Sequence, residues 1–332
     1  MSTARNFLIG SALVFAVIGG LAWTKKKEVP VAAAPAPVEV PIVQTQKIAL
    51  APKPVVKPQP KVPEAMPLPA EDIPDVNRIG QLFALDSSKL PIVETVSYTS
   101  RVPWLKGRPA WIADYASYFG TSRHFIARSL NRKPDYFTQK ISPGDRFNVF
   151  RKDMNIDFHL LIDLSRCRML FYYIDKDANE RVLLKTYRVG LGRPDSTRAS
   201  GYLTPTGKYL LGEKVAIYKE GTMGFFQDEK TEMIRVFGTR WIPFEKEIEN
   251  CSEAAKGYGL HGAPWVLDPV TGRYVEDASK IGKYESDGCI RLAAEDMEEI
   301  FAIVLTKPTT VELVKDFRDA KLPGVERRSA AQ

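Results

Sequence analysis

The spacing of hydrophobic positions changes several times along this chain, beginning with an uninterrupted apolar run. Phe7–Trp23 holds 17 residues without a charge, which is long enough for one helical pass through a bilayer. A cleaved signal peptide is the alternative, because Gly20-Leu21-Ala22 has the small-x-small pattern of a cleavage site. We assign residues 1–24 to an anchor or signal, with the membrane contacted through residues 7–23. The lysines at 25–27 slightly favour a cytoplasmic body, by about one charge.

Proline dominates the next segment. Twelve of the chain's 24 prolines lie between Pro30 and Pro74. Proline fixes φ and removes a backbone donor, so helix and sheet interiors are excluded here. We predict that residues 25–75 form an extended, semi-rigid linker. A ligand for SH3-type domains is the alternative interpretation.

Helical periodicity begins after residue 108. "PAWIADYASYFG" places apolar side chains at helical spacing and ends on Gly120, and "TSRHFIARSLN" repeats the pattern after a cap at Thr121 or Ser122. "ISPGDRFNVF" then gives a Pro-Gly turn and an alternating strand. These elements predict a small α+β module at residues 96–152. His124 lies on its second predicted helix, where we expect a surface position.

From Asp157 the pattern changes to short apolar strands separated by turns. Aromatic and β-branched residues dominate "FHLLIDLSRCRMLFYYI", "ERVLLKTYRVGLG", "GKYLLGEKVAIY" and "TVELVKD". One helix interrupts them, "AAEDMEEIFAIVL", with an apolar stripe and acidic residues in its first turn. We predict a mainly β domain at residues 157–316, a sandwich or open barrel with one minor helix, followed by a polar tail at 317–332.

Charge is distributed unevenly. The formal net charge is +7, and the stretch from Arg101 to Lys152 holds eleven Lys/Arg against three Asp/Glu. Such a basic module favours an anionic partner, although a solvated basic face would have the same composition. No groove-reading or base-stacking motif accompanies the charge, so we do not expect nucleic acid as a partner.

Cysteine and histidine are scarce. Three cysteines do not describe a disulfide framework, although a Cys167–Cys251 bridge stays open for an oxidising compartment. Cys289 is different, because it lies among small, polar and charged residues in "YESDGCIRL". His261, in "GYGLHGAPW", belongs to the same β domain, whereas His159 lies in a strand where a structural role is expected.

Cys289 and His261 have the chemistry of a nucleophile and its base. Cysteine attacks as a thiolate, and an imidazole can accept its proton. Flanking glycines, including Gly262 and Gly288, would leave room for a substrate. The amides of Gly288 and Cys289 could face a developing oxyanion. We expect neither a metal nor a cofactor.

Two families resemble parts of this sequence. The helix, helix, Pro-Gly turn and strand of residues 96–152 resemble a LysM module, a βααβ fold that binds N-acetylglucosamine polymers. Its first strand is not recognisable, and "SYTSRVPWLKGRP" occupies that place. "HG" at 261–262 followed by "SDGCIRL" at 286–292 resembles the L,D-transpeptidase (YkuD-type) catalytic domain, as do "YRVGLG", "GYLTPTGKYLL" and "VFGTRWIPF" in the same order.

The second resemblance implies a reaction. Enzymes of this family remodel peptidoglycan through a thioester between a stem peptide and their cysteine, which an acceptor amine then resolves. The resemblance implies Cys289 as nucleophile and His261 as base, oriented by the Gly262 carbonyl. It also implies that Arg291 braces the cysteine loop and that Ser286 forms hydrogen bonds within it.

From the matching Gly-x-Arg-Trp segment we take Arg240 and Trp241 as substrate-site candidates. The implied partners are glycan strands and stem peptides, and the implied location is the cell envelope, with the body anchored at the inner membrane and lying in the periplasm. The alternatives are an L,D-carboxypeptidase or endopeptidase that uses the same cysteine, or a non-catalytic wall-binding protein.

The sequence departs from the family pattern twice. Asp287 stands where the family has a second histidine, so that position cannot supply an imidazole. It could organise the loop or hold the His261 cation, and its negative charge would raise the thiol pKa. Twenty-four residues separate His261 from Ser286, against a mid-teens spacing in the family. "LDPVTGRY" in this interval predicts an inserted hairpin over the site.

Overall fold

The computed structural model describes residues 66–131 and 140–327. The apolar run at 7–23 and most of the predicted linker therefore lie outside the described residues. Among the residues that are described, no helix has the length and apolar character needed to cross a membrane.

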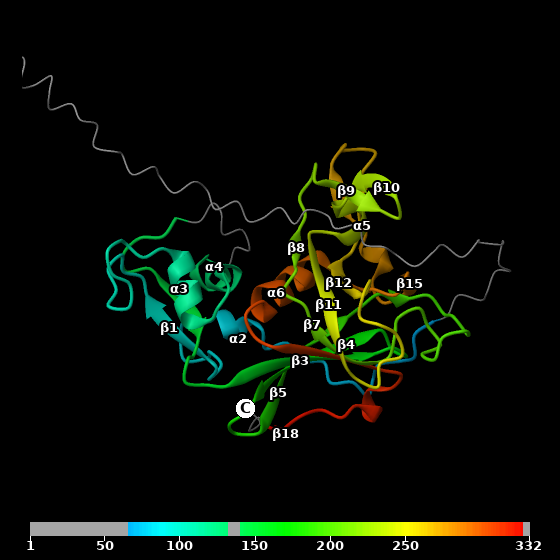
Figure 1. The fold of residues 1–332 in the computed structure, drawn as a ribbon, viewed down its shortest axis with the longest axis horizontal. Helices are drawn as coiled ribbons and strands as arrows, with labels where there is room; N and C mark the ends of the chain where they lie inside the picture. Colours follow the sequence, from blue (N-terminus) through cyan, green and yellow to red (C-terminus); the bar gives the residue numbers. More distant parts are fainter. Residues whose placement is uncertain (1–65, 132–139, 328–332) are drawn as a thin grey trace, which may run out of the picture. The chain divides into compact units, whose positions relative to one another are not determined.

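A continuous, curled sheet of ten strands organises the C-terminal half of the chain (Figure 1). Its path runs from one edge to the other through β16 (Ile290–Leu292), β12 (Gly259–Gly262), β11 (Arg240–Glu249), β7 (Gly207–Leu211), β17 (Thr309–Val314), β3 (Ile156–Asp163), β4 (Arg168–Asp175), β5 (Glu180–Arg188) and β18 (Val325–Glu326), with β8 (Ala216–Ile217) paired to β11. The mainly β prediction is confirmed, and ten of the strands form one continuous sheet, with further strands in two-stranded pairs beside it.

The central strands are buried on both faces, which explains why β3 and β4 have nearly continuous apolar sequences. Helix α6 (Ala294–Val304) contributes Met297, Ile300 and Phe301 to the large core on one face. Leu161, Leu170 and Tyr172 belong to a smaller core on the other face. The predicted single convincing helix is α6, with the expected acidic first turn.

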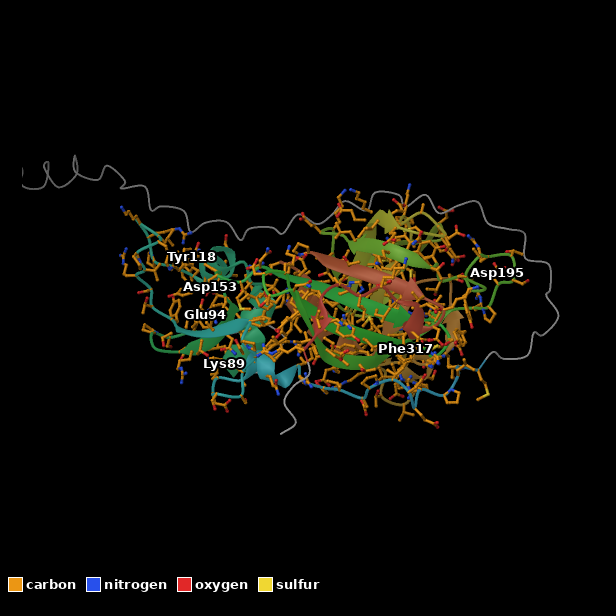
Figure 2. The ribbon with its side chains drawn as sticks, turned by 90° about the horizontal axis from the view of Figure 1, so that it is seen from below. Lys89, Glu94, Tyr118, Asp153, Asp195 and Phe317 are labelled. Atoms are coloured by element: carbon orange, nitrogen blue, oxygen red, sulfur yellow. The ribbon has the colours of Figure 1, made fainter. Side chains whose placement is uncertain are left out.

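Two segments predicted as linker and tail pack onto the β domain. Leu68 N–H donates to the Ser165 carbonyl (2.8 Å), and Ile73 is buried in the smaller core. After β17, η2 (Phe317–Asp319) leads to β18, which pairs in parallel with β5. Phe317, labelled in Figure 2, packs against the same smaller core. Scattered apolar residues within polar or proline-rich sequence make these contacts, and their spacing has no period that would predict them.

Residues 93–150 form a βααβ unit. Its elements are β1 (Val93–Ser97), α3 (Ile112–Phe119), α4 (Arg123–Asn131) and β2 (Arg146–Phe150), preceded by α2 (Gly80–Phe83). β1 and β2 are antiparallel, with Val93 opposite Phe150 and Ser97 opposite Arg146. The strand missing from the sequence prediction is β1, which begins three residues before the predicted boundary at 96. Glycan binding by this unit stays a prediction.

The βααβ unit shares its core with the β domain. The rings of Phe125, Phe150 and Phe158 form a chain with centroid separations of 4.5 and 5.8 Å. Ser122 Oγ donates to the Ala302 carbonyl at 2.5 Å, which ties α4 to α6. An open hollow of about 470 Å³ lies on this unit, lined by Lys89, Val93, Glu94, Arg151, Lys152 and Asp153; Figure 2 labels Lys89, Glu94 and Asp153.

Two hairpins project beside the short helix α5 (Ile234–Phe237). One consists of β9 (Met223–Phe226) and β10 (Glu229–Glu232), the other of β13 (Trp265–Leu267) and β14 (Tyr274–Glu276). The Tyr274 hydroxyl donates to Glu232 Oε2 at 2.5 Å and joins them. The second hairpin lies where the sequence predicted an insertion, and it contacts α5.

Candidate active site

Two short parallel strands bring His261 and Cys289 together. β12 pairs with β16 so that Leu260 lies opposite Ile290 and His261 opposite Arg291. Cys289 immediately precedes β16, and this register continues to place it beside Gly259. Residues two apart on a strand share a face, so the imidazole and the thiol lie on one side of the sheet. Strand spacing and rise per residue put their Cα atoms about 8 Å apart.

The Cys289 thiol is protonated at neutral pH. The residue is half-buried, and its Sγ lies 3.6 Å from the Gly257 carbonyl oxygen. Burial raises the pKa of the thiol to about 12, because a thiolate loses hydration there. The Gly259 amide and the Arg291 guanidinium lower this pKa, whereas the Asp287 carboxylate raises it. The increase of the thiol pKa by Asp287 agrees with the prediction from the sequence.

The His261 imidazole is neutral and fixed in orientation. It is 3% exposed, and its Nδ1 lies 2.8 Å from the Gly262 carbonyl. A carbonyl only accepts, so Nδ1 carries the hydrogen and Nε2 is left to accept a proton. Burial lowers the pKa of His261 to about 3; Arg291 lowers it further, and the carbonyls of Gly262 and Phe237 raise it.

These two states define what the pair can do. A neutral thiol beside a neutral imidazole is not a preformed thiolate–imidazolium pair. The proton must leave Sγ as the sulfur attacks, and a general base is needed at that moment. Nε2 of His261 is the ring nitrogen that the Gly262 carbonyl does not bind, and the imidazole lies on the same face of the sheet as the thiol.

The cysteine loop is held by Ser286, which is 1% exposed. Its Oγ donates to the Cys289 carbonyl at 2.7 Å and accepts from the Gly288 amide at 3.1 Å. Hydrogen bonding by Ser286 within the loop is what the family resemblance implies. It also occupies the Gly288 amide, which corrects the expectation that both amides face an oxyanion. Of the two, only the Cys289 amide stays a candidate donor.

Gly288 does not leave room for a substrate. Its φ is +120°, and a Cβ there would lie 2.6 Å from Tyr258 Cε1 and 2.8 Å from the Leu203 carbonyl oxygen. A side chain would clash and would also strain the backbone. Glycine is required at this position by close protein packing. Tyr258 and Leu203 are thus neighbours of the nucleophile loop that sequence reasoning missed.

The Asp287 carboxylate pairs with Arg193. Its Oδ1 lies 2.5 Å from Arg193 Nη2, and both side chains are more than half exposed. The Arg193 amide also donates to the Ser286 carbonyl at 3.0 Å. Asp287 therefore ties the cysteine loop to the segment after β6 (Leu191–Gly192). Of the two roles considered from sequence, the geometry matches loop organisation rather than pairing with His261.

Arg291 braces the loop through its backbone. Its amide donates to the Gly190 carbonyl and its carbonyl accepts from the Gly190 amide, both at 2.8 Å. Its buried Nε has no hydrogen-bond partner within the part of the chain that the structure describes. The charge of the guanidinium lowers the pKa of both Cys289 and His261.

Arg240 and Trp241 separate to opposite faces of β11. The Trp241 ring lies 5.8 Å from the His261 ring, and Phe237 lies 5.3 Å from it. Arg240 instead packs over Phe301 and pairs with Glu298 of α6 at 3.6 Å. Neighbouring strand residues face opposite ways, so Arg240 and Trp241 do not share the face of β11 beside His261, and a substrate contact by Arg240 stays a prediction.

The remaining cysteines are free thiols. Cys167 is buried, which raises its pKa to about 12, and Cys251 Sγ donates to the Lys208 carbonyl at 3.0 Å. The Cys167–Cys251 bridge left open by the sequence is therefore not formed. His159 is buried with Nε2 2.9 Å from Glu312 Oε2, a structural pair. Within residues 66–131 and 140–327, no cluster of metal-ligating side chains is present.

Comparison with known proteins identifies the domain that carries the site. Two solved structures are similar to this chain: one of Bd1075 from Bdellovibrio bacteriovorus (13% identity, TM-score 0.33, 50% of each chain), and one of the helical cell shape determining protein Pgp2 from Campylobacter jejuni (15% identity, TM-score 0.32, 51% of this chain and 50% of that one). The chain thus spans about half the length of each. No curated protein matches it. The YkuD family model, described as L,D-transpeptidase catalytic domain, matches residues 157–313, beginning where the sequence placed the domain. Residues 157–313 are therefore an L,D-transpeptidase catalytic domain of the YkuD type.

Proposed function

We propose that this chain is a peptidoglycan L,D-transpeptidase with Cys289 as nucleophile and His261 as general base. One observation carries the proposal: the parallel β12–β16 pair sets a partly exposed thiol and an orientated neutral imidazole on the same face within a YkuD domain. A structural cysteine would have no need of this neighbour.

In the first step Sγ attacks the carbonyl carbon that joins the third residue of a stem peptide to D-alanine. The thiol proton passes to His261 Nε2, and a C–S bond forms. The C–N bond to D-alanine then breaks, and His261 returns the proton to the leaving amine. A thioester on Cys289 is left, with no net change in oxidation state.

In the second step the amine of another stem attacks the thioester. His261 accepts a proton from that amine, a new amide bond forms and the C–S bond breaks. Sγ recovers the proton from His261. If water replaces the amine, the same cysteine performs L,D-carboxypeptidase chemistry and the product is a shortened stem. The acceptor decides between the two outcomes.

The test uses the purified chain with a stem tetrapeptide and an acceptor amine, followed by mass spectrometry. We expect a joined product that Cys289→Ala abolishes. Cys251→Ala is the matched control, since it removes another free thiol from a loop. If a shortened stem is the sole product, the enzyme is an L,D-carboxypeptidase that hydrolyses the thioester instead of transferring it to an amine. Joined product from the Cys289→Ala chain would refute the proposal.

The location and the N-terminal module belong to the same proposal. Peptidoglycan lies outside the cytoplasmic membrane, so the body must be exported, with residues 7–23 as its membrane contact or cleaved signal. The βααβ unit would hold the catalytic domain against glycan strands. Co-sedimentation of the chain with purified sacculi tests the binding. If the chain stops binding sacculi only when the acyl donor site is blocked, the catalytic domain binds the sacculi and the βααβ unit does not.

A further inference from the structure

Two segments of the chain flank the nucleophile loop. The first is the loop between β6 and β7, residues 193–206, whose Leu203 carbonyl packs against Gly288. The second is the segment before β12, residues 252–258, whose Tyr258 ring packs against Gly288 and whose Gly257 carbonyl lies 3.6 Å from Cys289 Sγ. Both segments therefore lie next to the nucleophile loop.

An ion pair connects them. Arg198 Nη1 lies 2.5 Å from Glu253 Oε1, with side chains 37% and 30% exposed. Asp195, labelled in Figure 2 on the same loop, lies farther from Arg198, at 3.8 Å. Tyr258 lies close enough to Arg198, Glu253 and Cys289 for each to affect its pKa, which burial raises. The geometric link to the nucleophile is Tyr258, which lies on the same segment as Glu253 and whose ring packs against Gly288 of the cysteine loop.

Neither segment needs this ion pair to keep its shape. The loop closes on itself, because the Arg198 amide donates to the Asp195 carbonyl at 3.1 Å and the Gly201 amide donates to the Arg198 carbonyl at 3.0 Å. The other segment is fixed by Ser252, whose amide donates to the Thr206 carbonyl at 2.9 Å. Exposed pairs contribute roughly 0–1 kcal/mol, so another carboxylate can replace Glu253 at little cost.

We propose that Arg198 is the receptor for the free carboxylate of the residue that leaves from the acyl donor, and that Glu253 occupies it until the substrate arrives. The inference rests on the proposed function, in which the departing D-alanine carries that carboxylate. The planar guanidinium suits two-point binding of a carboxylate. The pair then acts as a specificity device, because a peptide without a terminal carboxylate cannot replace Glu253.

Opposite effects of the two halves of the pair test the idea. With a tetrapeptide donor that ends in a free carboxylate, Arg198→Gln should raise KM about tenfold, because a charge-assisted hydrogen bond is lost. Glu253→Gln should lower KM about threefold, because the competing carboxylate is gone. With the same donor as a C-terminal amide, neither variant should change KM. kcat should stay within about twofold throughout, since neither residue touches the reacting atoms.

Lys176→Gln supplies the matched control. Its ion pair with Asp157, at 3.0 Å, has side chains exposed to 42% and 29% and lies on β3 and the end of β4. If Arg198→Gln and Glu253→Gln shift KM in the same direction, the pair is a brace and the proposal is overturned. Equal effects on the acid and the amide donors overturn it as well.

Binding measured without chemistry separates this inference from the proposed function. Calorimetry of the tetrapeptide acid and amide with the Cys289→Ser chain should show tighter binding of the acid, and Arg198→Gln should abolish the difference. If that contrast is seen while the wild-type chain turns over neither peptide, the proposed function fails and Arg198 keeps its role. If turnover is seen without the contrast, the inference alone fails.

Discussion

Acid should destabilise this protein through His261. The buried imidazole has its pKa lowered to about 3, whereas an unfolded chain presents a histidine of pKa 6.5. Between these values the unfolded state binds the extra proton, so stability is fully present above pH 6.5 and falls as pH falls toward 3. From pH 7 to pH 4.5 this single group costs about 2.5 kcal/mol of unfolding free energy.

Urea unfolding of the wild-type chain and of His261→Gln at both pH values measures this loss. Glutamine has no titration in this range, so the variant should lose about 2.5 kcal/mol less than wild type between pH 7 and pH 4.5. All other ionisable groups are common to both chains, so their contributions cancel in the difference. Equal acid losses in the two chains would show that the imidazole is charged in the folded state, contrary to its burial.

Three further outcomes follow from the site. Because the Cys289 pKa is about 12, a fraction of about 10⁻⁵ of this thiol is thiolate at pH 7. The rate of its alkylation by iodoacetamide should therefore rise about tenfold per pH unit, as measured by peptide mapping. A rate that reaches a plateau below pH 9 would contradict this. Trp241→Ala should hydrate His261 and lower kcat about tenfold or more, whereas Arg240→Gln should lower the melting temperature and leave kcat unchanged; the reverse pattern would place Arg240 at the substrate. Gly288→Ala should cost about 2–4 kcal/mol of stability through backbone strain and its clash with Tyr258, and a melting temperature equal to wild type would show that the loop adapts freely.

The sequence predicted the elements whose patterns are long and regular. Strands β3, β4 and β5 have unbroken apolar or aromatic runs, and α6 has a clear stripe with an acidic first turn. β12 and β16 have four and three residues and are interrupted by glycine or charge, so their spacing has no usable period. Their parallel register is a non-local fact that joins residues about thirty positions apart.

The sequence predicted the site best where a motif specifies residue types. It predicted poorly which side chains fill the space around those residues. His261 on β12 and Cys289 immediately before β16 lie on one face of the paired strands, whereas their roles as base and nucleophile stay predictions. The open space inferred from Gly288 is filled by Tyr258, and the partner of Asp287, Arg193, lies 94 positions earlier in the chain. Strand alternation explains why Arg240 and Trp241 face opposite sides of β11, but the sequence analysis had not assigned a strand to this segment.

Mass spectrometry of the chain incubated with a carbapenem tests the nucleophile most directly, since such β-lactams acylate the thiol of this family. We expect one acyl adduct per chain, on the peptide that contains Cys289, and none on the Cys289→Ala variant. An unmodified Cys289 in a folded chain, or an adduct on Cys251 instead, would contradict the account.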